Sequence, residues 1–130
     1  MAATGSSPWS EPLSRDECQR HLESATAARV LLSLRGLPAA LPARIELVDG
    51  DQLVISSREN AVRLAARRGD VISVQIDGID ENNHTWSVTA TGIAAVAHPE
   101  EFEERFKRIA DCGATLSVIP LSVVTGQSAP

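Results

Sequence analysis

The sequence predicts a mainly β fold, a small β-barrel of about six antiparallel strands with two or three short peripheral helices. Three observations favour this class. Short apolar or alternating runs recur along the chain and are separated by turn signals, of which Asp49-Gly50 is the clearest. Only a few segments have the apolar spacing of an amphipathic helix. The length of 130 residues, with 43% hydrophobic and 22% charged residues, suits one globular domain with a single core.

The composition of the two ends sets the expected domain boundaries. Residues 1–12 are rich in Ser, Pro, Gly and Ala, which predicts a flexible arm. A single domain is expected over residues 13–127, followed by a short tail over residues 128–130.

The domain is expected to open with a helix in the segment LSRDECQRHLES. Ser14 and Glu17, three residues apart, form a capping-box pattern at its start. Cys18 and Leu22 follow at a spacing of four and therefore lie on one apolar face.

Three strands are expected after this helix. The segment Arg35 to Pro38 is turn material, and Asp49-Gly50 is typical of a hairpin turn. Pro42 has no N–H, so it belongs at an edge or a bulge rather than in a fully paired strand. The expected strands are Val30 to Leu34, Ala39 to Leu47, and Leu53 to Ser57.

The second half of the chain alternates two expected helices with strands. RENAVRLAARRGD is typical of a helix that stops at Gly69, and HPEEFEERFKRIADCG predicts a further helix. VISVQIDG reads as a strand, and another is expected from Thr85 to Val96. Over Thr85 to Thr91, one face can bury Trp86, Val88 and Ala90 in a core, whereas the opposite face carries only Ser and Thr. The final segment TLSVIPLSVVTGQ predicts one or two strands.

Charge and motif content exclude several classes of function. The net charge of −5 argues against nucleic acid as the main partner. No apolar run approaches the roughly 20 residues that span a bilayer, and the first residues lack a signal-peptide pattern, so we expect a cytoplasmic protein. Cys18 and Cys112 lack metal-ligand spacing, and no nucleophile-elbow, phosphate-loop or dinucleotide motif is present. The sequence contains no recognisable catalytic set made of protein groups alone.

One basic cluster stands out against the acidic background. Ser56 and Ser57 end a strand, and Arg58, Arg63, Arg67 and Arg68 follow in the next helix. Hydroxyl donors beside a helix start and guanidinium groups are typical of a site for a phosphate monoester. The alternative is a solvated basic helix face that balances nearby acids, and spacing alone leaves both readings open.

The order of these motifs resembles the pyridoxamine 5′-phosphate oxidase-like, flavin-binding split-barrel family over about Leu13 to Gln127. The matching segments are LSRDECQRHL, GLPAALPARIEL, LVISSRENAVRLAA, VISVQIDGID…HTWSVTATGIA and VIPLSVVTGQ. The resemblance implies a split β-barrel that forms a homodimer, with FMN at the subunit interface. It also implies phosphate contacts from Ser56, Ser57, Arg58 and Arg63. The flavin ring would lie near Arg44 and Ile45, and the family's Trp-Ser pair corresponds to Trp86 and Ser87.

Two functional hypotheses follow from this resemblance. The first is an FMN-binding oxidoreductase that acts on an unidentified small-molecule substrate. The alternative is a non-catalytic dimeric barrel that binds a deazaflavin, haem, another small ligand or a protein partner. A barrel without any cofactor belongs to this alternative, because ARV, ISS and Gln127 depart from the family's commonest residues.

Overall fold

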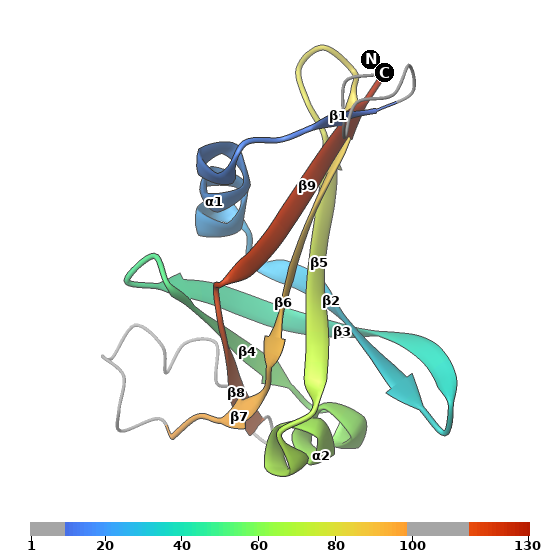
Figure 1. Cartoon of the computed structure of the whole chain (residues 1–130), viewed down its shortest axis with the longest axis vertical. Coiled ribbons are helices and arrows are strands. Elements are labelled where there is room, and N and C mark those ends of the chain that lie inside the picture. Colours follow the sequence, from blue (N-terminus) through green and yellow to red (C-terminus); the bar gives the residue numbers. More distant parts are fainter. Residues whose placement is uncertain (1–9, 99–114) are drawn as a thin grey trace, which may run out of the picture.

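The computed structural model describes residues 10–98 and 115–130. The helix expected in HPEEFEERFKRIADCG therefore falls, apart from His98, outside the described residues. In the described part of the chain, nine antiparallel strands form one curled sheet with the order β1-β9-β6-β5-β2-β3-β4-β8-β7 (Figure 1). The mainly β split-barrel class is confirmed, although the strands outnumber the six expected. Neither described helix is long and apolar enough to cross a membrane.

The elements in chain order are β1 (Glu11–Pro12), α1 (Arg15–Ser24), β2 (Ala27–Leu34), β3 (Leu37–Val48), β4 (Gln52–Ser57), α2 (Asn60–Arg68), β5 (Val71–Ile79), β6 (Thr85–Ile93), β7 (Ala95–Val96), β8 (Thr115–Pro120) and β9 (Val123–Ala129).

The additional strands arise at three places. Glu11 and Pro12, assigned above to the arm, pair with Ser128 and Gln127 of β9, so the sheet takes in parts of the expected arm and tail. The strand expected from Thr85 to Val96 is interrupted at Ala94, whose N–H donates to the carbonyl of Asp70 instead of to a ladder partner. The C-terminal segment forms two strands, β8 and β9.

The curl of the sheet brings distant strands together. In the sheet order β6 and β8 are separated by four other strands, yet Gly92 of β6 lies against Pro120 of β8. A Cβ atom at Gly92 would come within 3.1 Å of the Pro120 carbonyl oxygen. Because glycine has no side chain, Gly92 allows β6 and β8 to approach each other closely here.

The two described helices close the core from different sides, α1 beside β9 and α2 at the lower end of Figure 1. Both halves of the predicted capping box are present at Ser14 and Glu17, and Cys18 and Leu22 are buried as expected. Helix α2 buries Val62, Ala65 and Ala66 and ends at Gly69, which has a φ of 71°. A left-handed residue at this position is the usual helix stop, and glycine adopts it without steric cost.

Strand β4 is covered on both of its faces. Leu53 and Ile55 belong to the main core, whereas Val54 belongs to a second apolar cluster that also contains Val48 and Leu116. Because side chains alternate along a strand, Ser56 lies on the same face as Val54. Ser56 therefore lies on the face of the sheet that carries the second apolar cluster, opposite to the main core. The pocket that contains Ser56 opens on this face.

Candidate functional site

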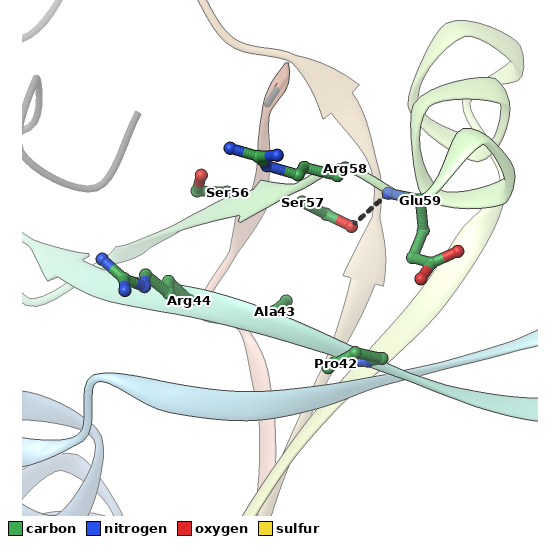
Figure 2. A pocket seen from close by; sticks show the side chains of 7 residues that line it. All are labelled: Pro42, Ala43, Arg44, Ser56, Ser57, Arg58 and Glu59. Carbon is green, nitrogen blue, oxygen red and sulfur yellow. Dashed lines mark hydrogen bonds between the residues drawn. The ribbon is translucent and has the colours of Figure 1, made fainter. Parts of the chain in front are cut away.

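The pocket that contains Ser56, Ser57 and Arg58, termed the main pocket, lies where strands β3 and β4 separate. Their ladder ends at the pair Arg44 and Ser56, and beyond it β3 pairs only with β2. The proline at position 42 lies in this singly paired half of β3, as its missing N–H predicts. The resulting pocket has a volume of about 350 Å³ (Figure 2). Its lining residues are Pro42, Ala43, Arg44, Ser56, Ser57, Arg58 and Glu59.

The two serines that end β4 have different roles in this pocket. Ser56 is only 5% exposed, and its hydroxyl has no hydrogen-bond partner in the described part of the chain. The Ser57 hydroxyl accepts a hydrogen bond of 3.0 Å from the Glu59 N–H and so shapes the turn into α2. The Ser57 carbonyl accepts from the Thr115 hydroxyl at 3.4 Å. Ser56 is therefore available to a ligand, while Ser57 mainly holds the backbone in place.

Two guanidinium groups give the pocket a positive end. Arg44 comes from β3 and Arg58 from the residue after β4, and in Figure 2 both side chains point toward the same side of the pocket. Because Arg44 lies directly opposite Ser56 in the ladder, the two side chains share one face of the sheet. Two guanidinium groups beside a hydroxyl donor form an arrangement that suits an oxyanion such as a phosphate.

The structure does not bring every predicted site residue to this pocket. Ile45 is 1% exposed and packs in the main core, and its N–H donates to the Thr26 carbonyl at 3.1 Å. Arg63 donates to the Asn60 side-chain oxygen at 2.6 Å and lines a separate pocket of about 80 Å³ with Arg67. Neither residue is among those that line the main pocket of this chain.

Trp86 and Ser87 also lie away from the main pocket. The Trp86 ring stacks on His21 of α1, with ring centroids 3.7 Å apart. The indole also lies close to Gly78, where a Cβ atom would be 2.8 Å from the ring. Ser87 lies between Asp77 and Gln127 in the sheet. Trp86 thus has a packing role within this chain, as its place on the apolar face of the strand predicts, and the structure adds His21 as its stacking partner.

The uncharged face of β6 is a hydrogen-bonded sheet surface. The hydroxyls of Ser73 and Thr91 lie 2.7 Å apart, and the Gln75 amide donates to Thr89 at 3.4 Å. Ser73, Gln75, Thr89 and Thr91 are all half-buried. These cross-strand pairs account for the row of Ser and Thr that the sequence shows.

Three other side chains with reactive groups, Asp77, Asp80 and Cys18, have structural roles. Asp77 forms an ion pair with Arg29, and the Asp80 carboxylate accepts hydrogen bonds from the N–H groups of Asn82 and His84. Burial raises the pKa of the Cys18 thiol, which therefore remains protonated at neutral pH. Within residues 10–98 and 115–130, no group of three His, Cys, Asp or Glu side chains could hold a metal ion.

Three residues that line the pocket were not anticipated as site residues: Pro42, Ala43 and Glu59. Pro42 carried a usable signal, because a proline within a strand marks a place where one neighbour is missing. Glu59 carried a weaker signal, since it occupies the N-cap of α2, a position that favours Ser, Thr, Asp or Asn.

Comparisons with known proteins identify the family. The family model described as pyridoxamine 5′-phosphate oxidase matches residues 14–114, most of the chain. This chain belongs to the pyridoxamine 5′-phosphate oxidase family. It is also 33% identical over 102 residues to the uncharacterized protein Rv0080 of Mycobacterium tuberculosis, an alignment that covers 75% of this chain and 67% of that protein.

Solved structures place this pyridoxamine 5′-phosphate oxidase family member among proteins of the same fold. An FAD-binding protein from Mesorhizobium loti superposes with a TM-score of 0.75 at 18% identity, covering 93% of this chain and 99% of that one. An FAD- and haem-binding protein from Mycobacterium smegmatis gives a TM-score of 0.72 at 16% identity, covering 91% and 73%. At these identities the likeness shows the shared fold.

Proposed function

We propose that the protein binds FMN as a cytoplasmic homodimer and uses it for redox chemistry on a small-molecule substrate. The observation that carries this proposal is the pocket at the end of the β3–β4 ladder. Arg44, Ser56 and Arg58 lie together there, although they come from two different strands and a loop. Family membership supports a phosphate-bearing ligand at such a site.

The residues present fit the phosphate end of FMN. Two guanidinium groups can each donate charge-assisted hydrogen bonds to phosphate oxygens, and the Ser56 hydroxyl adds a neutral donor. Pro42 and Ala43 offer an apolar strip beside these donors, along which the rest of the ligand can lie. When bound, the flavin supplies the electron transfer, and the protein binds and orients it.

A homodimer is proposed because the family resemblance implies one and because apolar side chains are exposed away from the pocket. Val71 and Ile93 are neighbours in the β5–β6 ladder and are 64% and 61% exposed. Leu34 lines a small cavity together with Val71 and is 45% exposed. Contiguous apolar surface of this kind is typical of a subunit interface. Trp86 and Ser87, which match the family's Trp-Ser pair, lie away from this pocket within one subunit, so they would contact the flavin only from a second subunit.

FAD is a second candidate cofactor, favoured by the small pocket beside Arg63 and Arg67. That pocket includes Thr115 and Leu116 of β8, which pair with Ser57 and Ser56 of β4. A dinucleotide could place its second phosphate there, and the fold neighbours include FAD-binding proteins. In that case Arg63→Ala should weaken FAD while leaving FMN nearly unchanged.

The first experiment is the absorption spectrum of the purified protein, with mass spectrometry of any released ligand. The flavin absorbance band and the mass of FMN would support the proposal, whereas a Soret band would indicate haem. FMN should also raise the melting temperature, because a ligand that binds the native state stabilises it. A protein that neither contains nor binds a flavin would overturn the proposal and favour a non-catalytic barrel.

The second experiment tests the phosphate site itself. Arg44→Ala and Arg58→Ala should each weaken FMN by about tenfold or more, and should change riboflavin affinity little, because only a phosphate contact is removed. Arg20→Ala, on α1 and away from the pocket, is the matched control. Equal losses for FMN and riboflavin would show that these arginines do not bind the phosphate.

A further inference from the structure

The main pocket has an acidic end opposite its basic end. Glu59 is the acidic member of its seven lining residues. In Figure 2 the Glu59 carboxylate lies on the side of Pro42 and the start of α2, whereas the guanidinium groups of Arg44 and Arg58 lie on the other side. A ligand in this pocket therefore meets two cations at one end and a carboxylate at the other.

The backbone of Glu59 is held firmly, while its carboxylate is left without a partner in the described residues. The Glu59 N–H donates to Ser57, and its carbonyl accepts from the N–H groups of Val62 at 3.1 Å and Arg63 at 3.3 Å. Glu59 is the N-cap of α2, but its side chain makes no capping hydrogen bond. No ion pair or other side-chain interaction engages it within the described chain.

A glutamate at this position therefore does not act through a capping hydrogen bond. Ser, Thr, Asp and Asn cap helices well because their short side chains reach back to the N–H groups of the first turn. Glu59 is exposed and lines the pocket, and in Figure 2 its carboxylate extends toward the side of Pro42, away from Arg44 and Arg58. A residue that departs from a local preference at a ligand pocket points to a role in binding.

The chemistry of a carboxylate limits what it can face. An ionised carboxylate only accepts hydrogen bonds, and it repels another anion nearby. A phosphate would thus be driven to the arginine end, and the portion of the ligand next to Glu59 must donate hydrogen bonds. The hydroxyl groups of a ribityl chain, which adjoin the phosphate in FMN, have this property.

We infer that Glu59 is a specificity-determining residue that binds the hydroxyl-bearing chain of a flavin and orients its phosphate toward Arg44 and Arg58. This inference rests on the proposed flavin function and adds the recognition of the polyol chain. It assigns phosphate and chain to different residues of one pocket, so the two contacts can be tested separately.

The test measures the affinity of three flavins for the unmodified protein and for Glu59→Ala. The flavins are FMN, riboflavin and lumiflavin, which has the ring but neither the ribityl chain nor the phosphate. Glu59→Ala should weaken riboflavin by a factor of about ten and should leave lumiflavin unchanged. It should weaken FMN as well, by no more than riboflavin, because the lost contact to the chain is shared whereas the relieved repulsion of the phosphate favours FMN alone. Arg58→Ala, in contrast, should weaken FMN alone.

Two further variants sharpen the comparison. Glu59→Gln keeps an acceptor oxygen without the charge and should lose less affinity for riboflavin than Glu59→Ala does. Glu81→Ala removes an exposed glutamate in the β5–β6 turn, remote from the pocket, and should change no affinity. Circular dichroism and melting temperatures would verify that each variant is folded.

The possible failures are distinguishable. If the unmodified protein binds none of the three flavins, the proposed function and this inference both fall. If FMN binds and Arg58→Ala weakens only FMN, but Glu59→Ala changes no affinity or weakens all three flavins equally, only the role of Glu59 is overturned. A larger loss for Glu59→Gln than for Glu59→Ala would also overturn it.

Discussion

At the scale of single residues, the start of α1 links a sequence pattern to a measurable pH dependence. The Ser14 N–H donates to the Glu17 carboxylate at 3.2 Å, and the Ser14 hydroxyl accepts from the Glu17 N–H at 3.1 Å. The hydrogen bonds from Ser14, first from its backbone and then from its side chain, lower the pKa of Glu17 below its ordinary value. The folded protein therefore favours the ionised form of this carboxyl group.

We predict that the contribution of Glu17 to stability is lost in acid. Because its pKa is lower in the folded than in the unfolded state, the stabilisation is complete above the unfolded pKa. It then disappears as the pH falls through the folded pKa. Urea unfolding of the unmodified protein and Glu17→Gln should show a gap in the free energy of unfolding at neutral pH that closes on acidification.

The control for this experiment is Glu23→Gln. Glu23 is an exposed residue of the same helix, and its side chain makes no hydrogen bond within the described part of the chain. The difference in free energy of unfolding between Glu23→Gln and the unmodified protein should be small at every pH. A Glu17→Gln gap that stayed constant from neutral to acid pH would contradict the assignment of the capping box as its cause.

At the scale of elements, the β2–β3 hairpin shows how a turn sets the register of a long pair of strands. Leu34 pairs with Leu37, so Arg35 and Gly36 form a two-residue turn. Their φ angles of 54° and 80° are both positive, as a type I′ turn requires. This turn fixes the register of β3 on β2, and through it the position of Pro42 and Arg44 in the pocket.

We predict opposite effects for two substitutions in this turn. Arg35→Asn should raise the melting temperature by a few degrees, because asparagine tolerates positive φ better than arginine does. Gly36→Ala should lower the free energy of unfolding by about 1 kcal/mol, since alanine is strained at this φ. The space around Gly36 is empty, so a clash would not explain the loss.

Differential scanning calorimetry of both variants would test the turn. Ser33→Ala, in the strand just before it, serves as the comparison and should change stability little. If Arg35→Asn lowered the melting temperature instead, the Arg35 side chain would have to stabilise the protein through contacts that outweigh the strain of its positive φ.

At the scale of the whole molecule, charge and shape act on the pocket together. The chain has a net charge of −5, yet two arginines line one end of its main pocket. These two arginines attract a phosphate locally, whereas the net negative charge of the chain repels it. Dissolved salt screens the attraction between the arginines and the phosphate over about 10 Å. The dimer proposed above depends instead on apolar contact, which salt does not weaken.

We predict that FMN binding is sensitive to salt and riboflavin binding is not. Raising sodium chloride from about 50 mM to about 500 mM should weaken FMN several-fold, because the phosphate contact is screened, and should leave riboflavin within about twofold. Titrations of both flavins at matched ionic strengths would measure this. Parallel behaviour of the two flavins would argue that the phosphate lies outside the Arg44–Arg58 end of the pocket.

We predict that Ile93→Glu converts the proposed homodimer to a monomer, because a charge would be buried in an apolar interface. If the proposed flavin site lies at that interface, the same change should weaken FMN about tenfold. Ile79→Glu is the matched control. Ile79 is 66% exposed against 61% for Ile93, and it lies at the opposite end of the β5–β6 pair. Analytical ultracentrifugation would give the mass, and an unchanged mass for Ile93→Glu would place the interface elsewhere.

Some features of this protein are determined by neighbours in the sequence. The capping box at Ser14, the stop of α2 at Gly69 and the alternation of β5 depend on residues within a few positions of one another. The resemblance of ordered motifs was enough to indicate the split barrel and its family. Of the predicted phosphate residues, Ser56, Ser57 and Arg58 line the main pocket because they are consecutive.

Tertiary structure alone decided which other residues join them. The register of β3 on β4 places Arg44 opposite Ser56 and sends the next side chain, Ile45, into the core. A shift of one residue would exchange the two, and no local pattern fixes that choice. Arg63 lies one turn along α2 from the pocket, and Trp86 meets His21 across 65 positions of chain. Strand pairing and packing over such separations depend on the whole sheet, which is why the sequence indicated some of the residues that line the pocket but not all of them.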